Sequence, residues 1–382
     1  MRLAFLSIGR HIHTERWIQW FARRGHACHL LTVQPGPIDG VTVHDITAGG
    51  RTKALRYWRS LSKVRRYLSE LQPDLLNTHF LTGYGYWGHF SRMHPNVLTV
   101  WGDDIYVTPF ESSLKNWLAR RALASCDALT GDSVDVLDVA CRRLGADPQR
   151  AYRVLWGVDF HTFRPGIGKT LRQELGYTDN EVVFVSPRSY TQSYYNIDIV
   201  IAAAARVREA VPEARFLFCG YEGDPAPFEL LARDAGLGDT AKVIGRLPHA
   251  EFAAVLGAGD IFVSVPSVDA TAVSLLEAMS CGRAVIVSGL PSALEWVEPG
   301  QCGQVVPPRD VDRLAQAMLT YAREPQLRRC HGEAALAIAR RHFDFDANLE
   351  CVAAIFARLV SGAGEWPRHV SLPVLQGRGG DE

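Results

Sequence analysis

Short apolar runs alternate with longer amphipathic stretches along almost the whole chain, and this alternation restricts the possible folds more than any other feature. An apolar run of four to six residues between helical stretches is typical of a strand in a parallel sheet that is covered on both faces. The candidate strands are Leu3–Ile8, Cys28–Val33, Leu75–His79, Val97–Trp101, Ala128–Gly131, Val182–Ser186, Arg215–Cys219, Ala241–Ile244, Ile261–Val265 and Ala284–Val287. The candidate helices are Glu15–Arg24, Lys53–Leu71, Leu114–Ser125, Ile197–Val211, Phe228–Ala235, Glu251–Gly257, Ala272–Cys281, Val311–Tyr321, Pro325–Phe343 and Asp346–Val360. The sequence therefore predicts an α/β protein with doubly wound, Rossmann-like sheets.

The alternation restarts after a break that contains proline and glycine, Phe163–Gly168. We therefore expect two doubly wound domains, at 1–165 and 166–345. A helix at 346–360 follows and is a candidate to cross back to the first domain. Residues 361–382 lack periodicity and are predicted to form a mobile tail. Because doubly wound sheets bind ligands beyond the carboxyl ends of their strands, we expect the two domains to face each other across a binding cleft.

Charge and composition exclude several classes of protein. Lys and Arg number 41 and Asp and Glu also number 41, which argues against a nucleic-acid binder that works by overall charge. No window approaches the roughly 18 apolar residues of a membrane span, and the N-terminal apolar run is too short for a signal peptide. The eight cysteines are scattered without a Cys-x-x-Cys pair, which indicates neither a zinc site nor a disulfide framework. We expect a cytoplasmic protein.

The charge is nevertheless unevenly distributed. Residues 1–165 contain 21 Lys and Arg against 14 Asp and Glu, and much of the excess lies in the segment Arg51–Arg66. Basic side chains there alternate with Leu55, Trp58 and Leu61 at helical spacing, as in helices that contact anionic lipid. Two interpretations stay open: a solvated helix packed on a sheet, or peripheral contact with the inner face of a membrane.

The segment 263–285 carries the clearest chemical signal. A predicted strand ends before a loop of small residues, and a helix then opens near Ala272. Unpaired backbone N–H groups at Thr271–Ser274 would form an anion site at that helix N-terminus. Asp269 precedes the helix and Glu277 lies within it, and a carboxylate can accept two hydrogen bonds from a diol such as ribose. A solvent-exposed aspartate and a glutamate on the helix surface are the alternative interpretation.

Several segments in order resemble the retaining family-4 (group 1) glycosyltransferases of GT-B fold. The family signature Glu-x7-Glu followed by Ala-Met-Ala-x-Gly-x-Pro-Val stands here as Asp269-x7-Glu277, then Ala-Met-Ser-Cys-Gly-Arg-Ala-Val. Further segments that match the family in sequence order are Arg24–Cys28, Gln72–His79, Gly157–Asp159 with Phe163–Pro165, Gly245–Pro248 and Ala258–Ser264. The resemblance covers about residues 1–360 and implies a transferase that uses a nucleotide sugar.

The resemblance also implies roles for individual residues. Glu277 would hold the ribose hydroxyls and Asp269 would contact the donor sugar. The helix N-terminus and Arg188 would bind the diphosphate, with Arg188 neutralising it as the sugar–phosphate bond breaks. The further positions that the resemblance places at the donor are Thr271, Ala272 and Val273 at the diphosphate, Leu247 beside the base, and Gly9 in the glycine loop of the first domain. No cofactor and no metal are implied.

The chain departs from the family pattern at several positions. The family lysine that follows the arginine is missing, and its place falls on Tyr194 or Tyr195. Three possibilities stay open: Arg188 and tyrosine hydroxyls suffice to stabilise the leaving diphosphate, another basic residue takes the place of the lysine, or the activity is weak. Trp101 and Asp103 stand in the segment where many members carry a histidine that contacts substrate, and Trp156 replaces an asparagine. Stacking of the two tryptophans on a flat acceptor and packing in the core are both open.

The function that we expect is retaining transfer of a sugar from a UDP- or GDP-sugar to a hydroxyl of a glycan, a lipid-linked acceptor or a small molecule. His79, at the end of a predicted strand, joins Trp101 and Asp103 as an acceptor-side candidate. Two alternatives remain. One is a nucleotide-sugar epimerase on the same fold, and the other is a homologue that binds a nucleotide sugar or glycan without turnover.

Overall fold

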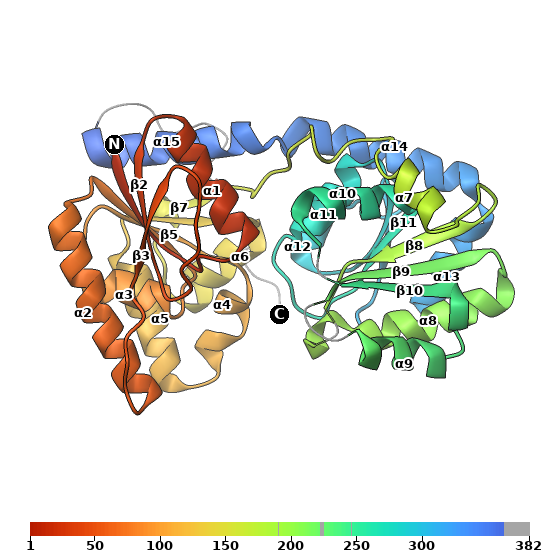
Figure 1. The fold of residues 1–382 in the computed structure, drawn as a ribbon, viewed down its shortest axis with the longest axis horizontal. Helices are drawn as coiled ribbons and strands as arrows, with labels where there is room; N and C mark the ends of the chain where they lie inside the picture. Colours follow the sequence, from red (N-terminus) through yellow and green to blue (C-terminus); the bar gives the residue numbers. More distant parts are fainter. Residues whose placement is uncertain (190, 222–224, 246, 363–382) are drawn as a thin grey trace, which may run out of the picture. The chain divides into compact units, whose positions relative to one another are not determined.

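The computed structural model describes residues 1–189, 191–221, 225–245 and 247–362. Most of the tail predicted over 361–382 lies outside these ranges. The chain forms two compact units (Figure 1), one of residues Met1–Trp156 with the segment from Ala347 onward, and one of Gly157–Asp346. The first unit thus ends at Trp156 rather than at Pro165, and the whole predicted linker, Phe163–Gly168, belongs to the second unit. The last helix is grouped with the first unit.

Unit 1 is built on a seven-stranded parallel sheet of order β3-β2-β1-β4-β5-β6-β7. Its strands are β1 (Arg2–Leu6), β2 (Ala27–Thr32), β3 (Val41–Asp45), β4 (Leu75–His79), β5 (Asn96–Thr99), β6 (Ala128–Gly131) and β7 (Ala151–Arg153). Its helices are α1 (Ile12–Arg23), α2 (Lys53–Leu71), α3 (Tyr84–Ser91), α4 (Asp103–Tyr106), α5 (Ser113–Ser125), α6 (Val134–Asp138) and α15 (Phe345–Ser361). The strands β1 and β4 are almost wholly buried because helices cover both faces.

Each face of the unit 1 sheet has its own apolar layer. On one face, α2 and α3 pack Leu61, Val64 and Trp87 against the strands. On the other face, Phe21 of α1 stacks on Phe356 of α15, with ring centroids 5.1 Å apart and an interplanar angle of 13°. This stacking fixes α15, the last of the described helices, on unit 1.

Unit 2 is built on a six-stranded parallel sheet of order β10-β9-β8-β11-β12-β13. Its strands are β8 (Val182–Ser186), β9 (Ala214–Tyr221), β10 (Ala241–Gly245), β11 (Ile261–Ser264), β12 (Ala284–Ser288) and β13 (Gln304–Val306). Its helices are α7 (Lys169–Glu174), α8 (Ile197–Ala210), α9 (Ala226–Asp234), α10 (His249–Ala258), α11 (Val273–Ser280), α12 (Pro291–Leu294), α13 (Val311–Arg323) and α14 (Pro325–His342). In this sheet β8 lies between β9 and β11, so the strand order reverses there. Doubly wound folds bind ligands beside such a reversal, at the carboxyl ends of the strands.

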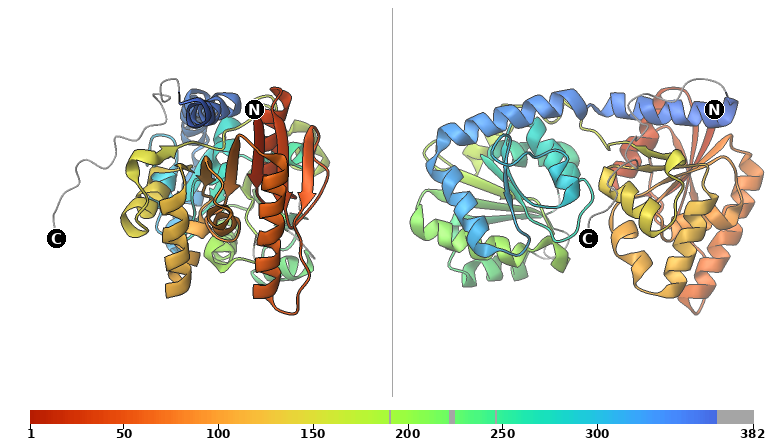
Figure 2. Two further views of the ribbon diagram at one scale, coloured as in Figure 1. Left: turned by 90° about the vertical axis from the view of Figure 1, so that its left-hand side faces the viewer. Right: turned by 180° about the vertical axis from the view of Figure 1, so that it is seen from behind.

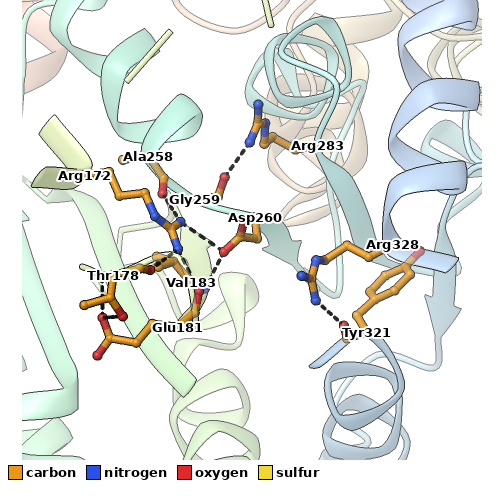
Figure 3. Close-up of polar contacts among 10 residues, drawn as sticks. All are labelled: Arg172, Thr178, Glu181, Val183, Ala258, Gly259, Asp260, Arg283, Tyr321 and Arg328. Atoms are coloured by element: carbon orange, nitrogen blue, oxygen red, sulfur yellow. Dashed lines mark hydrogen bonds and ion pairs between the residues drawn. The ribbon is translucent and has the colours of Figure 1, made fainter. Parts of the chain in front are cut away.

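The amino ends of these strands are held by an ion pair (Figure 3). The Asp260 carboxylate accepts hydrogen bonds from Arg172 Nη1 at 3.1 Å and from the Val183 backbone N–H at 2.9 Å. Nη2 of Arg172 donates to the backbone carbonyls of Thr178 and Glu181. Asp260 belongs to one of the segments that resemble the family, and its role here is structural, since it ties β11 to β8.

Candidate nucleotide-sugar site

Arg188 follows β8 and is held by two acceptors at the carboxyl end of the unit 2 sheet. Its Nε donates to Ser264 Oγ at 2.8 Å, and its Nη2 donates to Asp269 Oδ2 at 2.6 Å. The side chain of Arg188 is 10% exposed and that of Asp269 is 21% exposed. Burial lowers the pKa of the Arg188 guanidinium, but Asp269 and Tyr195 outweigh it, so this pKa is raised overall. The structure therefore brings together Arg188 and Asp269 and keeps a fixed positive charge there.

The N-terminus of α11 opens beside this ion pair. The helix begins at Val273, its N-cap residue Ala272 is extended, and Ala272 makes no side-chain cap hydrogen bond to any residue that the structure describes. The first N–H groups of a helix have no intrahelical acceptor, and the helix dipole favours an anion near them. A pocket within unit 2 is lined by Arg188, Asp269, Ala272 and Ser288 among others. A cation and a helix N-terminus thus meet at one pocket, which suits an anionic group such as a phosphate.

Glu277 lies on the second turn of α11, 3% exposed, and is paired with a residue that sequence reasoning missed. Its Oε1 lies 2.6 Å from Nε2 of His249, the first residue of α10. Phe163 packs against the His249 ring with centroids 4.8 Å apart. Leu247, the predicted neighbour of the base, is half-buried two residues before His249. The only sequence signal for His249 was its position directly after the family-like segment that ends at Pro248.

The tyrosines at the missing lysine's place are fixed by the loop that follows β11. The Tyr194 carbonyl accepts from the Ser267 N–H at 2.7 Å, and Asn196 Nδ2 donates to the Val265 carbonyl at 2.8 Å. The Tyr195 ring lies beneath the Arg188 guanidinium, with Cζ 4.9 Å from the ring centroid. Tyr195 therefore contacts Arg188 through a cation–π interaction.

Of the acceptor-side candidates in unit 1, His79 is fully buried at the carboxyl end of β4. Its Nε2 lies 2.9 Å from Asn77 Oδ1, and its Nδ1 has no hydrogen-bond partner among the residues that the structure describes. Burial, with a smaller contribution from His11, lowers the pKa of His79 to about 3. The ring packs edge-on against Trp17 at a centroid distance of 5.4 Å. His79 is thus a neutral group inside an aromatic cluster.

Trp101 belongs to the same cluster and is only partly buried. It stacks on Phe80 at 4.2 Å and contacts Trp156 at 4.5 Å and His11 at 4.9 Å between ring centroids. Trp156 is 5% exposed, which favours core packing over stacking on a ligand for that residue. Trp101 retains the exposure that stacking would need.

Asp103 and Asp104 have opposite environments. Asp103 is the exposed first residue of α4. Asp104 is 2% exposed and accepts from the backbone N–H groups of Leu81 at 2.6 Å and Gly102 at 2.7 Å. Burial raises the pKa of Asp104 to about 6. Sequence reasoning named Asp103 and missed Asp104, which holds the backbone next to Trp101.

Gly9 has a packing role. A Cβ there would lie 2.3 Å from the Gln34 carbonyl oxygen, and its N–H donates to Thr32 Oγ1 at 2.9 Å. Close approach to the loop after β2 is sufficient to require glycine at this position.

Two further properties concern metal binding and membrane crossing. In the ranges that the structure describes, no group of three or more His, Cys, Asp or Glu side chains could hold a metal ion. None of the described helices has both the length and the apolar character that crossing a bilayer needs.

Comparisons with known proteins give the family. A family model described as "Glycosyl transferases group 1" matches residues 169–337, and one described as "Glycosyl transferase 4-like" matches residues 2–133. The D-inositol 3-phosphate glycosyltransferase of Segniliparus rotundus is 26% identical over 394 residues, which cover 94% of this chain and 86% of the relative. The enzyme of the same name from Kribbella flavida is 30% identical over 228 residues, 57% of this chain and 52% of the relative, so this match spans about half of that protein.

A solved structure shares the fold. HepE from Anabaena in complex with UDP-glucose has a TM-score of 0.80 and 18% identity, with 94% of this chain and 100% of that chain covered. Both halves of the sequence thus match family models, and each half folds into the Rossmann-like unit that these proteins share. The chain belongs to the group 1 glycosyltransferases of GT-B fold.

Proposed function

We propose that this glycosyltransferase is retaining and independent of metal and other cofactors, and that its donor is a UDP- or GDP-sugar. One observation carries the proposal. The Arg188 guanidinium, held between Ser264 and Asp269, lies at the same pocket as the uncapped N-terminus of α11. Both can bind a diphosphate. The buried carboxylate of Glu277 on the next turn of α11 suits the ribose diol.

In the proposed reaction the bond between the anomeric carbon and the phosphate oxygen breaks, and the electron pair stays on the diphosphate. Arg188 and the α11 N–H groups stabilise that growing charge. The acceptor hydroxyl oxygen bonds to the same face of the anomeric carbon, and its proton passes to the departing diphosphate. Asp269 would contact the hydroxyls of the donor sugar and, through its ion pair, set the direction of the guanidinium.

For the acceptor we propose a hydroxyl-bearing glycan, glycolipid or small molecule that binds unit 1. Trp101 is the candidate stacking surface there, and Asp103 is the candidate hydrogen-bonding group, because both reach solvent. His79 would support Trp101 from within the cluster. The relatives act on D-inositol 3-phosphate by name, so this compound belongs in the first panel of acceptors.

The experiment incubates the protein with UDP-glucose, GDP-glucose and their galactose, mannose and N-acetylglucosamine counterparts, in EDTA, with and without acceptors. We expect a transferred sugar whose anomeric configuration, measured from the proton coupling constant, is that of the donor. Inversion would contradict a retaining mechanism, and turnover only with added Mg²⁺ or Mn²⁺ would contradict metal independence. A changed sugar nucleotide without acceptor would identify an epimerase. Binding without turnover would support the non-catalytic alternative.

A further inference from the structure

Two helices of unit 1, α2 and α5, carry many basic side chains and very few acidic ones. Between Arg51 and Leu71 the chain has seven Lys and Arg and one acidic residue, Glu70. Glu70 is paired with Arg66 at 3.6 Å, in the last turns of α2. On α5, Arg120 and Arg121 have no acidic residue on their own helix, whereas Lys115 is paired with Glu111, which lies just before the helix. The two helices therefore present a strongly positive surface although the chain as a whole is neutral.

Large apolar side chains protrude from the same two helices. Trp58 on α2 is 52% exposed, and on α5 Leu114 is 65% and Trp117 is 50% exposed. Leu55 on α2 and Phe110 just before α5 are exposed as well. These five are half of the large hydrophobic residues that are exposed in the described part of the chain. If both helices were merely solvated, there would be no reason for each of them to expose a tryptophan together with a leucine.

The helix α3 lies between α2 and α5 and joins them into one face. The Trp58 ring lies 5.4 Å from that of Phe90 on α3, and the Tyr86 hydroxyl of α3 donates to the Lys115 carbonyl of α5 at 3.4 Å. In Figure 2 (left view) the orange α2 and the lighter α5 run along the same side of the unit 1 sheet. We call Leu55, Trp58, Leu114 and Trp117, with the basic residues of both helices, the α2–α5 face.

We propose that the α2–α5 face binds the surface of a bilayer that contains anionic lipid. Basic side chains attract the negative headgroups, and each contributes roughly a fivefold change in partitioning near such a surface. Tryptophan and leucine side chains lie at the boundary of headgroups and acyl chains in interfacial helices. A nucleic acid or an acidic protein would account for the charge but not for the protruding apolar side chains. This inference goes beyond the proposed donor chemistry and does not depend on it.

The test measures co-sedimentation of the full chain with vesicles of phosphatidylcholine alone and of phosphatidylcholine with phosphatidylglycerol. One variant reverses charge on the face, Arg56→Glu/Arg59→Glu/Arg121→Glu, and a second removes the apolar anchors, Trp58→Ser/Trp117→Ser. The matched controls lie on unit 2: Arg208→Glu/Arg233→Glu/Arg341→Glu for charge, and Leu230→Ser/Leu231→Ser for the exposed apolar side chains of α9. Circular dichroism and the thermal unfolding midpoint show that each variant is folded.

We expect binding only to the anionic vesicles, weakened at least roughly a hundredfold by the charge-reversed variant. The tryptophan variant should bind at least roughly tenfold more weakly, since each indole loses apolar burial. Both controls should bind like the unchanged protein. The absence of binding to anionic vesicles would overturn the inference, as would equal losses in the controls. The inference would also be overturned if salt abolished the binding and the tryptophan variant bound as tightly as the unchanged protein. That result would identify the face as a site for polyanions.

Discussion

Replacement of Glu277 by glutamine tests whether this residue of α11 binds the ribose, and it does so without removing a buried side chain. The Glu277 carboxylate is 3% exposed, and one of its oxygens is hydrogen-bonded to His249 Nε2 at 2.6 Å. Glutamine has nearly the same shape and can still accept that hydrogen bond through its carbonyl oxygen. We therefore expect Glu277→Gln to fold, with a free energy of unfolding within about 1 kcal/mol of the unchanged protein.

The loss should appear in nucleotide binding. A hydrogen bond to a charged group contributes about 1.5–3 kcal/mol, so removing the charge that we assign to the ribose should weaken binding about tenfold to a hundredfold. Isothermal titration calorimetry with UDP and GDP measures this directly. The matched control is Glu251→Gln, which makes the same change at an exposed position on α10.

A deoxynucleotide makes the test specific to the ribose. The unchanged protein should bind 2′-deoxy-UDP more weakly than UDP, whereas Glu277→Gln should bind the two nearly equally, because the variant has already lost the interaction. An unchanged Kd for UDP in a folded variant would refute the assignment. So would a variant that still distinguishes the two nucleotides as strongly as the unchanged protein does.

Three further predictions concern other parts of the structure. Arg188→Ala should slow transfer at saturating donor by about a hundredfold or more in single-turnover kinetics, because the guanidinium acts on charge that develops as the bond breaks. The control is Arg172→Ala, which breaks the similarly exposed pair with Asp260. It should lower the stability and leave the transfer rate within about threefold of that of the unchanged protein. The pKa of His79 is about 3 in the folded protein and 6.5 in the unfolded chain, so its neutral form contributes its full stability above pH 6.5 and progressively less as the pH falls from 6.5 toward 3. Between pH 7 and pH 5, the free energy of unfolding of the unchanged protein should fall by about 2 kcal/mol more than that of His79→Asn, as measured by urea unfolding followed by tryptophan fluorescence. Equal losses in the two proteins would show that His79 is solvated. Gly257→Ala should lower the melting temperature measured by differential scanning fluorimetry, because its Cβ would lie 2.1 Å from the Ile167 carbonyl oxygen, and an unchanged value would show that this loop adjusts freely.

Much of the fold could be predicted because buried strands and amphipathic helices have strong periodic signals. The bounds predicted for Lys53–Leu71, Leu75–His79 and Val182–Ser186 are those of α2, β4 and β8. The sequence pattern missed β3, an edge strand that is only half-buried and therefore lacks a continuous apolar run. It also missed α3, which is apolar and aromatic on nearly all sides and thus has no polar face to reveal a helical period.

The candidate site was predictable only in part. Resemblance to the family identified Arg188, Asp269 and Glu277, and the structure brings Arg188 and Asp269 into contact although they lie far apart in the sequence. The partner of Glu277 could not be predicted, because His249 starts a different helix and only the packing of α10 against α11 brings the two side chains together. Likewise, nothing local distinguished the buried Asp104 from the exposed Asp103 beside it.

In the proposed mechanism, unit 2 binds the diphosphate of a nucleotide sugar through Arg188 and the N-terminus of α11, without a metal ion. Calorimetric titration of the protein with UDP and GDP in excess EDTA tests it most directly, with Arg188→Ala as the comparison and Arg172→Ala as its control. We expect one of the two nucleotides to bind in EDTA, with a Kd that added Mg²⁺ leaves unchanged. Arg188→Ala should bind this nucleotide more weakly, and Arg172→Ala should bind it as the unchanged protein does. Failure of both nucleotides to bind, or binding only when Mg²⁺ or Mn²⁺ is added, would contradict it.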